Sequence, residues 1–199
     1  MAVSAETVKE LRNMTGAGIL DCKKALEEAE GSIEKAVELL KKRNQAVAVK
    51  KLSREAKDGL VSSYVHDGGR IGVLVEVNSE TDFVAHSDAF AAFVKEICLQ
   101  IAAMAPQYVD RTQVPADELA KQKEIFLAQM EGINKPAPVL EKIVEGKLAK
   151  WYGEVCLVDQ TYIRDDSKTV QDLLTDVIGR CGENVKIRRF ARYALGEGL

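Results

Sequence analysis

Residues 71–84, IGVLVEVNSETDFV, decide the fold of this chain. Apolar side chains recur at every second position from Ile71 to Val77, and this period of two predicts a β-strand with one buried face. The polar run Asn78-Ser79-Glu80 then ends the pattern. The strand therefore leads through a polar break into a tip at residues 81–84.

This tip places a carboxylate, Asp82, beside an aromatic ring, Phe83. The ring could fold back onto the sheet, or it could project and fill a pocket on another protein. The sequence leaves both interpretations open. In the second, the tip is a surface that probes a partner.

A β-hairpin precedes the tip, because residues 60–66 and 71–77 flank the turn Asp67-Gly68-Gly69, whose glycines favour positive φ. A helix that begins at the cap Ser87 and ends before Pro106 is predicted to cover the sheet. Its apolar stripe comprises Phe90, Phe93, Ile97, Ile101 and Met104.

The rest of the chain after Pro106 alternates helices and short strands. Helices are predicted over residues 115–130 and from Pro138 to about Tyr152, and a capping box at residues 169–172 opens a periodic helix that Gly182 ends. Short strands are predicted at residues 154–158 and 185–195. The sum is an α+β core with a small antiparallel sheet covered by helices.

Three short amphipathic helices are predicted before this core, at residues 4–13, 19–29 and 33–40, with Ser32 as a cap and Gly31 as a left-handed stop. Residues 41–57 then carry seven basic side chains and one acid. This stretch fits a solvated helical connector better than a nucleic-acid site, because no aromatic residue interleaves it. The predicted division is a three-helix domain (1–44), a basic linker (45–58) and the core (59–199).

The composition of the chain argues against several classes of function. The net charge of −3 gives no general attraction to polyanions, and no segment approaches the roughly 20 apolar residues of a membrane span. The N-terminus lacks the features of a secretion signal, which predicts a cytoplasmic protein. Four scattered cysteines without a CxxC pair, and two histidines, give no zinc pattern, so neither metal nor cofactor is expected.

Catalytic motifs are also missing from the sequence. The Gly16-Ala17-Gly18 turn lacks the remainder of a phosphate-binding loop, and neither His66 nor His86 lies in a nucleophile–base signature. Cys22, Cys98 and Cys181 lie on the apolar sides of predicted helices, which favours core packing. The chain is therefore not expected to be an enzyme.

Several motifs, taken in order along the chain, resemble those of bacterial translation elongation factor Ts. They are Thr15-Gly16-Ala17-Gly18 with Asp21-Cys22-Lys23-Lys24-Ala25-Leu26, Glu76-Val77-Asn78, Thr81-Asp82-Phe83-Val84, residues 141–147, Lys168-Thr169-Val170, Gly182-Glu183-Asn184, Arg188-Arg189-Phe190 and residues 195–198. Each motif alone is weak, but they follow one another in the family's order, and the resemblance covers essentially the whole chain.

The resemblance implies a guanine-nucleotide exchange factor for elongation factor Tu, with an N-terminal domain of the ubiquitin-associated type. It implies that Thr81, Asp82, Phe83 and Val84 intrude near the magnesium-binding region of that GTPase. Arg12, Ile19, Leu20 and Lys23 are the expected contacts of the N-terminal domain. Ile19-Leu20 departs from the family pattern, in which many relatives have two methionines, so stiffer side chains replace soft ones at this contact.

The chain resembles the short form of the family. Long relatives contain a second core lobe and a helical hairpin, for which the length of 199 residues leaves no room. Two copies are therefore expected to associate as a homodimer and to supply the two lobes. Two other functions stay open on the residues alone: an RNA-binding module that uses the basic stretch with Arg188, Arg189 and Arg192, and a hydrolase or transferase.

Overall fold

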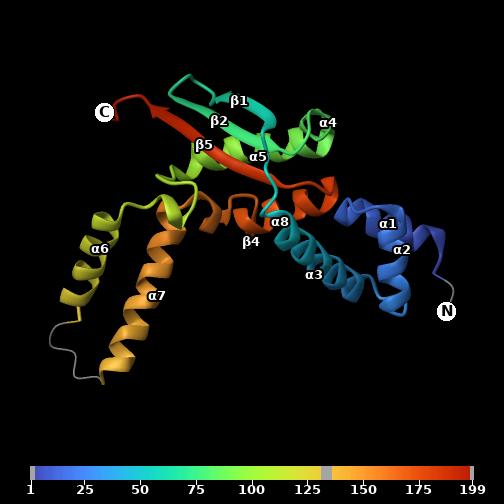
Figure 1. The fold of residues 1–199 in the computed structure, drawn as a ribbon, viewed down its shortest axis with the longest axis horizontal. Coiled ribbons are helices and arrows are strands. Elements are labelled where there is room, and N and C mark those ends of the chain that lie inside the picture. Colours follow the sequence, from blue (N-terminus) through green and yellow to red (C-terminus); the bar gives the residue numbers. More distant parts are fainter. Residues whose placement is uncertain (1–2, 131–135, 198–199) are drawn as a thin grey trace. The chain divides into compact units, whose positions relative to one another are not determined.

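The computed structural model describes residues 3–130 and 136–197 (Figure 1). Its helices are α1 (Ala5–Thr15), α2 (Ile19–Glu28), α3 (Ile33–Lys51), α4 (Asp82–Ala85), α5 (Asp88–Met104), α6 (Ala116–Ala128), α7 (Ala137–Val155) and α8 (Val170–Cys181). Its strands are β1 (Asp58–Val65), β2 (Ile71–Ser79), β3 (Thr161–Tyr162), β4 (Asp165–Thr169) and β5 (Val185–Ala194), and short 3-10 helices cover Arg111–Gln113 and Leu157–Asp159. The predicted α+β class is confirmed.

Two compact units divide the chain. The first comprises Met1–Val61, Glu76–Lys95 and Asp172–Ile187. The second comprises Ser62–Val75, Glu96–Gln171 and Arg188–Leu199. The division predicted at residues 44 and 58 stays a prediction.

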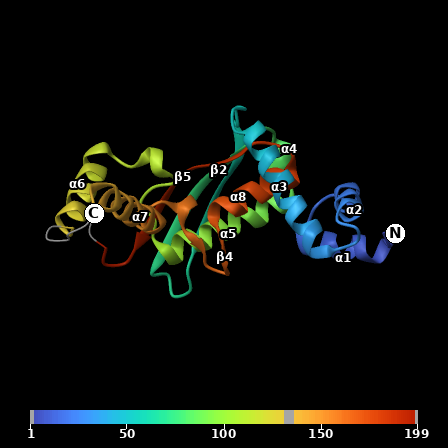
Figure 2. The same ribbon diagram turned by 90° about the horizontal axis from the view of Figure 1, so that it is seen from below.

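The three N-terminal helices form a small bundle around one apolar core (Figure 2). Ser4 and Ser32 cap α1 and α3 with their hydroxyls, and Gly31, with φ of 88°, ends the α2 turn by donating its N–H to the carbonyl of Leu26 at 2.8 Å. The core consists of Leu11, Cys22, Ala25, Leu26, Ala29, Ala36 and Leu40. The third helix is longer than predicted, because α3 continues through the basic stretch to Lys51.

The main sheet has the strand order β1-β2-β5. The predicted hairpin is confirmed: the N–H of His66 donates to the carbonyl of Ile71 at 2.9 Å, and Gly68 and Gly69 have φ of 83° and 68°. Val73, Val75 and Val77 are buried, as their period of two predicted. At the other end of β1, Gly59 has φ of 137°, and a Cβ there would lie 2.1 Å from the carbonyl oxygen of Val77.

The predicted stripe of α5 is correct at four of its five positions, since Phe90, Phe93, Ile97 and Ile101 are buried. Met104 is 45% exposed, so its predicted burial is wrong. It is the last residue of the helix, and Ala105, with φ of 45°, turns the chain there.

Helices α6 and α7 contact each other and form a helical hairpin, which both Figure 1 and Figure 2 show. Met130, Val144 and Leu148 form its core, with Leu140 and Trp151 packed against them. The expectation that the chain is too short for a helical hairpin is therefore wrong.

The strand predicted at residues 154–158 is also wrong. Helix α7 continues to Val155, and only Cys156 forms an isolated bridge, to Tyr108, before the 3-10 turn. Cys156 and Leu157 are fully buried, so their apolar character reflects core packing and not a strand. Cys156 thus joins Cys22 and Cys98 as a buried free thiol.

A two-stranded ribbon, β3 and β4, was not predicted. Asp165–Thr169 is polar throughout, so it has no apolar alternation to detect. The ribbon is held by polar side chains of α5: Gln100, fully buried, accepts a hydrogen bond from the N–H of Ile163 at 3.0 Å. Glu96 accepts from the hydroxyl of Tyr162 at 2.6 Å and from Nε of Arg164 at 2.7 Å.

Candidate partner-binding site

The tip is a sharp junction between β2 and the one-turn helix α4. Thr81 is the N-cap of α4, and its Oγ1 accepts from the N–H of Val84 at 3.4 Å. Ser79, fully buried at the end of β2, donates its hydroxyl to the carbonyl of Thr81 at 2.9 Å. Sequence reasoning missed α4, because four residues are too few to show a helical period.

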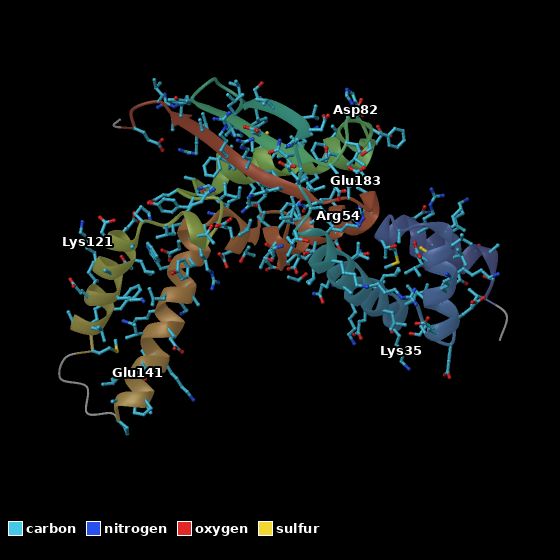
Figure 3. All side chains as sticks on the ribbon, viewed as in Figure 1. Lys35, Arg54, Asp82, Lys121, Glu141 and Glu183 are labelled. Carbon is cyan, nitrogen blue, oxygen red and sulfur yellow. The ribbon has the colours of Figure 1, made fainter. Side chains whose placement is uncertain are left out.

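A carboxylate from a distant part of the chain accepts two hydrogen bonds from this junction. Glu183 accepts the N–H of Thr81 at 3.0 Å with Oε2 and the hydroxyl of Thr81 at 2.8 Å with Oε1. Glu183 lies between α8 and β5, 102 positions away in sequence. Figure 3 labels this residue together with Asp82 and Arg54.

Glu80 is held in a similar way. The N–H of Asn184 donates to its Oε1 at 2.7 Å, and Arg54 donates to its Oε2 at 3.3 Å, while Nδ2 of Asn184 donates to the carbonyl of Arg54 at 2.7 Å. The hydrogen bond from Asn184 is the main cause that lowers the pKa of Glu80; partial desolvation opposes it, and Arg54 reinforces it. Glu80 therefore stabilises the junction in its ionised form.

The side chains of the tip, and Ala85 directly after it, differ in exposure. Phe83 is 84% exposed and Asp82 is exposed, whereas Val84 and Ala85 are buried. The ring therefore projects and does not fold back onto the sheet. Because Val84 is buried, its side chain is not available to contact a partner.

The four residues predicted as contacts on the N-terminal bundle are all exposed; Ile19 is 56% and Leu20 is 72% exposed. Arg12, Ile19 and Lys23 line an open groove of about 540 Å³. The remaining lining residues are Val3, Ala5, Val8 and Lys9. The groove has an apolar floor with cationic side chains, and Leu20 lies outside its lining. We refer to Arg12, Ile19, Leu20 and Lys23 as the N-terminal patch.

Sequence reasoning missed the residues that support the tip: Arg54, Glu183 and Asn184. A signal was present, because Gly182-Glu183-Asn184 is one of the motifs that resemble the family. Gly198, the last residue of the final motif, lies outside the described residues.

Over residues 3–130 and 136–197, no group of three or more His, Cys, Asp or Glu side chains could hold a metal ion. In the same part of the chain, no helix is long and apolar enough to cross a membrane.

These observations define a class of protein. It is an α+β protein that presents an exposed ring and carboxylate on a firmly held tip, and an apolar groove on a separate helical bundle. Both features suit contact with another protein.

Comparison with known proteins identifies the family. Residues 2–197 match the family model described as "Elongation factor TS". The elongation factor Ts of Caldanaerobacter subterraneus subsp. tengcongensis is 57% identical over 197 residues, which cover 99% of this chain and 98% of the relative. That of Anaeromyxobacter sp. strain Fw109-5 is 57% identical (99% and 90% covered), and that of Geobacter sulfurreducens is 53% identical over 199 residues (100% and 92% covered).

The chain belongs to the elongation factor Ts family. Its function is nucleotide exchange on elongation factor Tu during translation elongation, and it does this without being an enzyme. The function, the non-enzymatic character and the cytoplasmic setting of translation agree with the sequence predictions. This assignment takes the place of the RNA-binding and hydrolase alternatives.

Proposed function

We propose that the tip at residues 81–84 promotes GDP release by disturbing the magnesium-binding region of elongation factor Tu. The observation that carries the proposal is the 84% exposure of Phe83 on a junction fixed by hydrogen bonds. The ring enters between packed elements of the partner and separates them. Asp82, which only accepts hydrogen bonds, competes for the groups that hold the water shell of the metal ion.

The free energy gained by burying the Phe83 ring is too small for the ring to act alone. Burial of a phenylalanine side chain contributes about 1.5–3 kcal/mol, which corresponds to roughly a ten- to hundredfold change in affinity. The N-terminal patch supplies further binding energy, because it offers two exposed apolar side chains, Ile19 and Leu20, and two cations, Arg12 and Lys23. This patch holds the nucleotide-binding domain of the partner while the tip acts.

Exchange then follows from thermodynamic linkage. A factor that binds the empty GTPase more tightly than the loaded GTPase lowers the affinity for nucleotide by the same factor. No covalent bond is made or broken. The contacts of the tip must therefore be stronger with the nucleotide-free GTPase than with the loaded GTPase.

Removal of the ring tests this proposal. Phe83→Ala is expected to reduce the maximum rate of fluorescent-GDP release from elongation factor Tu by about tenfold or more, since the lost burial corresponds to at least this factor. The measurement is stopped-flow fluorescence at increasing concentrations of the variant. Because the ring is exposed, thermal unfolding serves as a control and should not change. A maximum rate equal to that of the unchanged chain contradicts the proposal.

We also propose that two copies of the chain associate. Support comes from exposed apolar side chains on the strands of the second unit, Val65 (66% exposed), Leu74 (50%) and Tyr193 (68%), and from Leu195 (70%) directly after β5. The N–H of Leu195 donates to the carbonyl of Arg70 at 2.8 Å, so the end of β5 lies beside the start of β2. Exposed apolar side chains favour association with a second apolar surface.

Light scattering after size-exclusion chromatography tests the association. The unchanged chain is expected at twice the monomer mass of 21.9 kDa, and Leu74→Lys at the monomer mass, because a charge on an apolar interface costs desolvation. Lys186→Glu, an exposed charge change on β5 in the first unit, is the control and should leave the mass unchanged. A monomeric unchanged chain at micromolar concentration contradicts the homodimer.

A further inference from the structure

We propose that Glu183 is a positioning residue for nucleotide exchange: its carboxylate sets the direction in which the tip presents Asp82 and Phe83. This inference rests on the proposed function of the tip. In this role Glu183 acts through Thr81, to which it is hydrogen-bonded.

The geometry of the carboxylate fixes two different properties of Thr81. Oε2 accepts the backbone N–H at 3.0 Å and thereby sets the direction of the chain as it leaves β2. Oε1 accepts the hydroxyl at 2.8 Å and thereby sets the side-chain rotamer. Hydrogen bonds to an ionised acceptor are stronger than those between neutral groups.

The rotamer of Thr81 matters because its Oγ1 is also the N-cap acceptor of α4. Helix α4 carries Asp82 and Phe83 in its first two positions. A single turn of helix has little stability of its own, so its orientation depends on the groups that cap and anchor it. Glu183 thus controls the orientation of the exposed ring through one intermediate residue.

The anchor itself is held firmly. Gly182, with φ of 68°, ends α8 directly before Glu183, and Asn184, directly after it, is buried. Asn184 binds Glu80 through its N–H and the carbonyl of Arg54 through Nδ2. Two successive residues of one segment, Glu183 and Asn184, therefore bind two successive residues of the other, Thr81 and Glu80.

A fixed tip acts on the partner at a lower entropic cost than a mobile one, because its conformation is already ordered before contact. Loss of the anchor should reduce the maximum rate of GDP release. It should not raise the concentration of exchange factor needed for half of that rate, since the N-terminal patch is unchanged. A residue with a purely structural role would instead lower the unfolding temperature and the folded fraction, which raises the apparent half-saturating concentration and leaves the maximum rate unchanged.

Stopped-flow release of fluorescent GDP from elongation factor Tu tests this role on the full chain. Glu183→Ala, which removes both hydrogen bonds to Thr81, is expected to lower the maximum rate by about tenfold. Glu183→Gln, which keeps one acceptor, should lose less. Thr81→Val, which removes only the hydroxyl, should be slower by a few-fold, and Thr81→Ser should stay within about twofold of the unchanged chain.

A matched control comes from a carboxylate that makes two short hydrogen bonds elsewhere. Glu96 binds Tyr162 and Arg164 in the second unit, so Glu96→Gln should lower the unfolding temperature without changing the maximum rate. A Glu96→Gln chain that exchanges as slowly as Glu183→Gln would show that the loss is general destabilisation and would overturn the positioning role.

A double-mutant cycle with Phe83→Ala tests whether Glu183 acts through the tip. If Glu183 acts through the tip, Glu183→Gln should slow the Phe83→Ala chain by less than it slows the unchanged one, and should slow a chain with both Asp82→Asn and Phe83→Ala by less than about twofold. If it slows that chain as much as it slows the unchanged one, the positioning role is wrong while the proposed function of the tip stands. If Phe83→Ala alone leaves the rate unchanged, the proposed function fails, and the positioning role fails with it.

Discussion

The tip and the N-terminal patch both expose apolar side chains to a partner, but they are supported by different forces. The tip is held by hydrogen bonds to carboxylates, from Thr81 to Glu183 and from Asn184 to Glu80. The N-terminal patch lies on a helical bundle whose core is apolar and includes Leu11 and Leu26, both fully buried.

This difference bears on how each region responds to change. An apolar core tolerates conservative substitution of similar volume, because packing is spread over many contacts. A hydrogen-bonded junction depends on single atoms, and removal of one partner leaves the other unsatisfied. The tip is therefore expected to be precise and sensitive, and the bundle to be more tolerant, except at the centre of its core.

The largest effect is expected at that centre. Leu26→Ala should lower the free energy of unfolding of the bundle by about 2–5 kcal/mol, because it removes a fully buried side chain and leaves a cavity. Denaturant unfolding followed by helical circular dichroism measures this. Leu20→Ala, on the exposed side of the same helix, is the control and should change stability by less than about 0.5 kcal/mol. Equal losses would mean that the bundle is not held by its apolar core.

Next in size is the patch itself. The double substitution Ile19→Ala with Leu20→Ala should raise the half-saturating concentration for exchange by about tenfold, since both side chains are exposed and free to be buried by a partner. The maximum rate should stay the same, because the tip is unchanged. A lower maximum rate with an unchanged half-saturating concentration would reverse the roles assigned to the two regions.

A smaller effect is expected when the tip loses its charge but keeps its ring. Asp82→Asn should slow exchange by roughly three- to fivefold, the scale of an exposed electrostatic interaction. This loss should be present in magnesium buffer and vanish when the metal ion is removed with EDTA, because the carboxylate competes for groups around that ion. Equal slowing with and without magnesium would contradict a role at the metal site.

The smallest effect concerns pH. The pKa of Glu80 is lower in the folded chain, so its contribution to stability is present above the unfolded pKa and is lost as the pH falls through the folded value. Glu80→Gln should therefore be less stable than the unchanged chain at pH 7, and the difference should shrink below pH 4.5, the ordinary pKa of the group. Urea unfolding at several pH values measures this, and a constant difference would contradict it.

The sequence predicted the elements that have a strong period or a strong cap. The alternation from Ile71 to Val77, the caps Ser32 and Ser87, and the stops at Gly31 and Gly182 correspond to features of the structure. The ribbon Asp165–Thr169 was missed because its polar residues carry no period, and the one turn of α4 because it is too short.

The site was predicted only in part, for a related reason. Asp82 and Phe83 stand out in the sequence as an unusual pair, and so they were singled out. The support from Glu183 joins residues 102 positions apart, and no local pattern encodes such a contact. The burial of Val84 likewise depends on the turn of α4, which the sequence did not reveal.

Titration calorimetry of the full chain with elongation factor Tu tests the central claim most directly. The account predicts that the chain binds the nucleotide-free GTPase at least tenfold more tightly than the GTPase loaded with GDP and magnesium, a difference of about 1.4 kcal/mol or more. Equal affinity for the two forms would contradict it, because a factor that does not discriminate between them cannot shift the release of nucleotide.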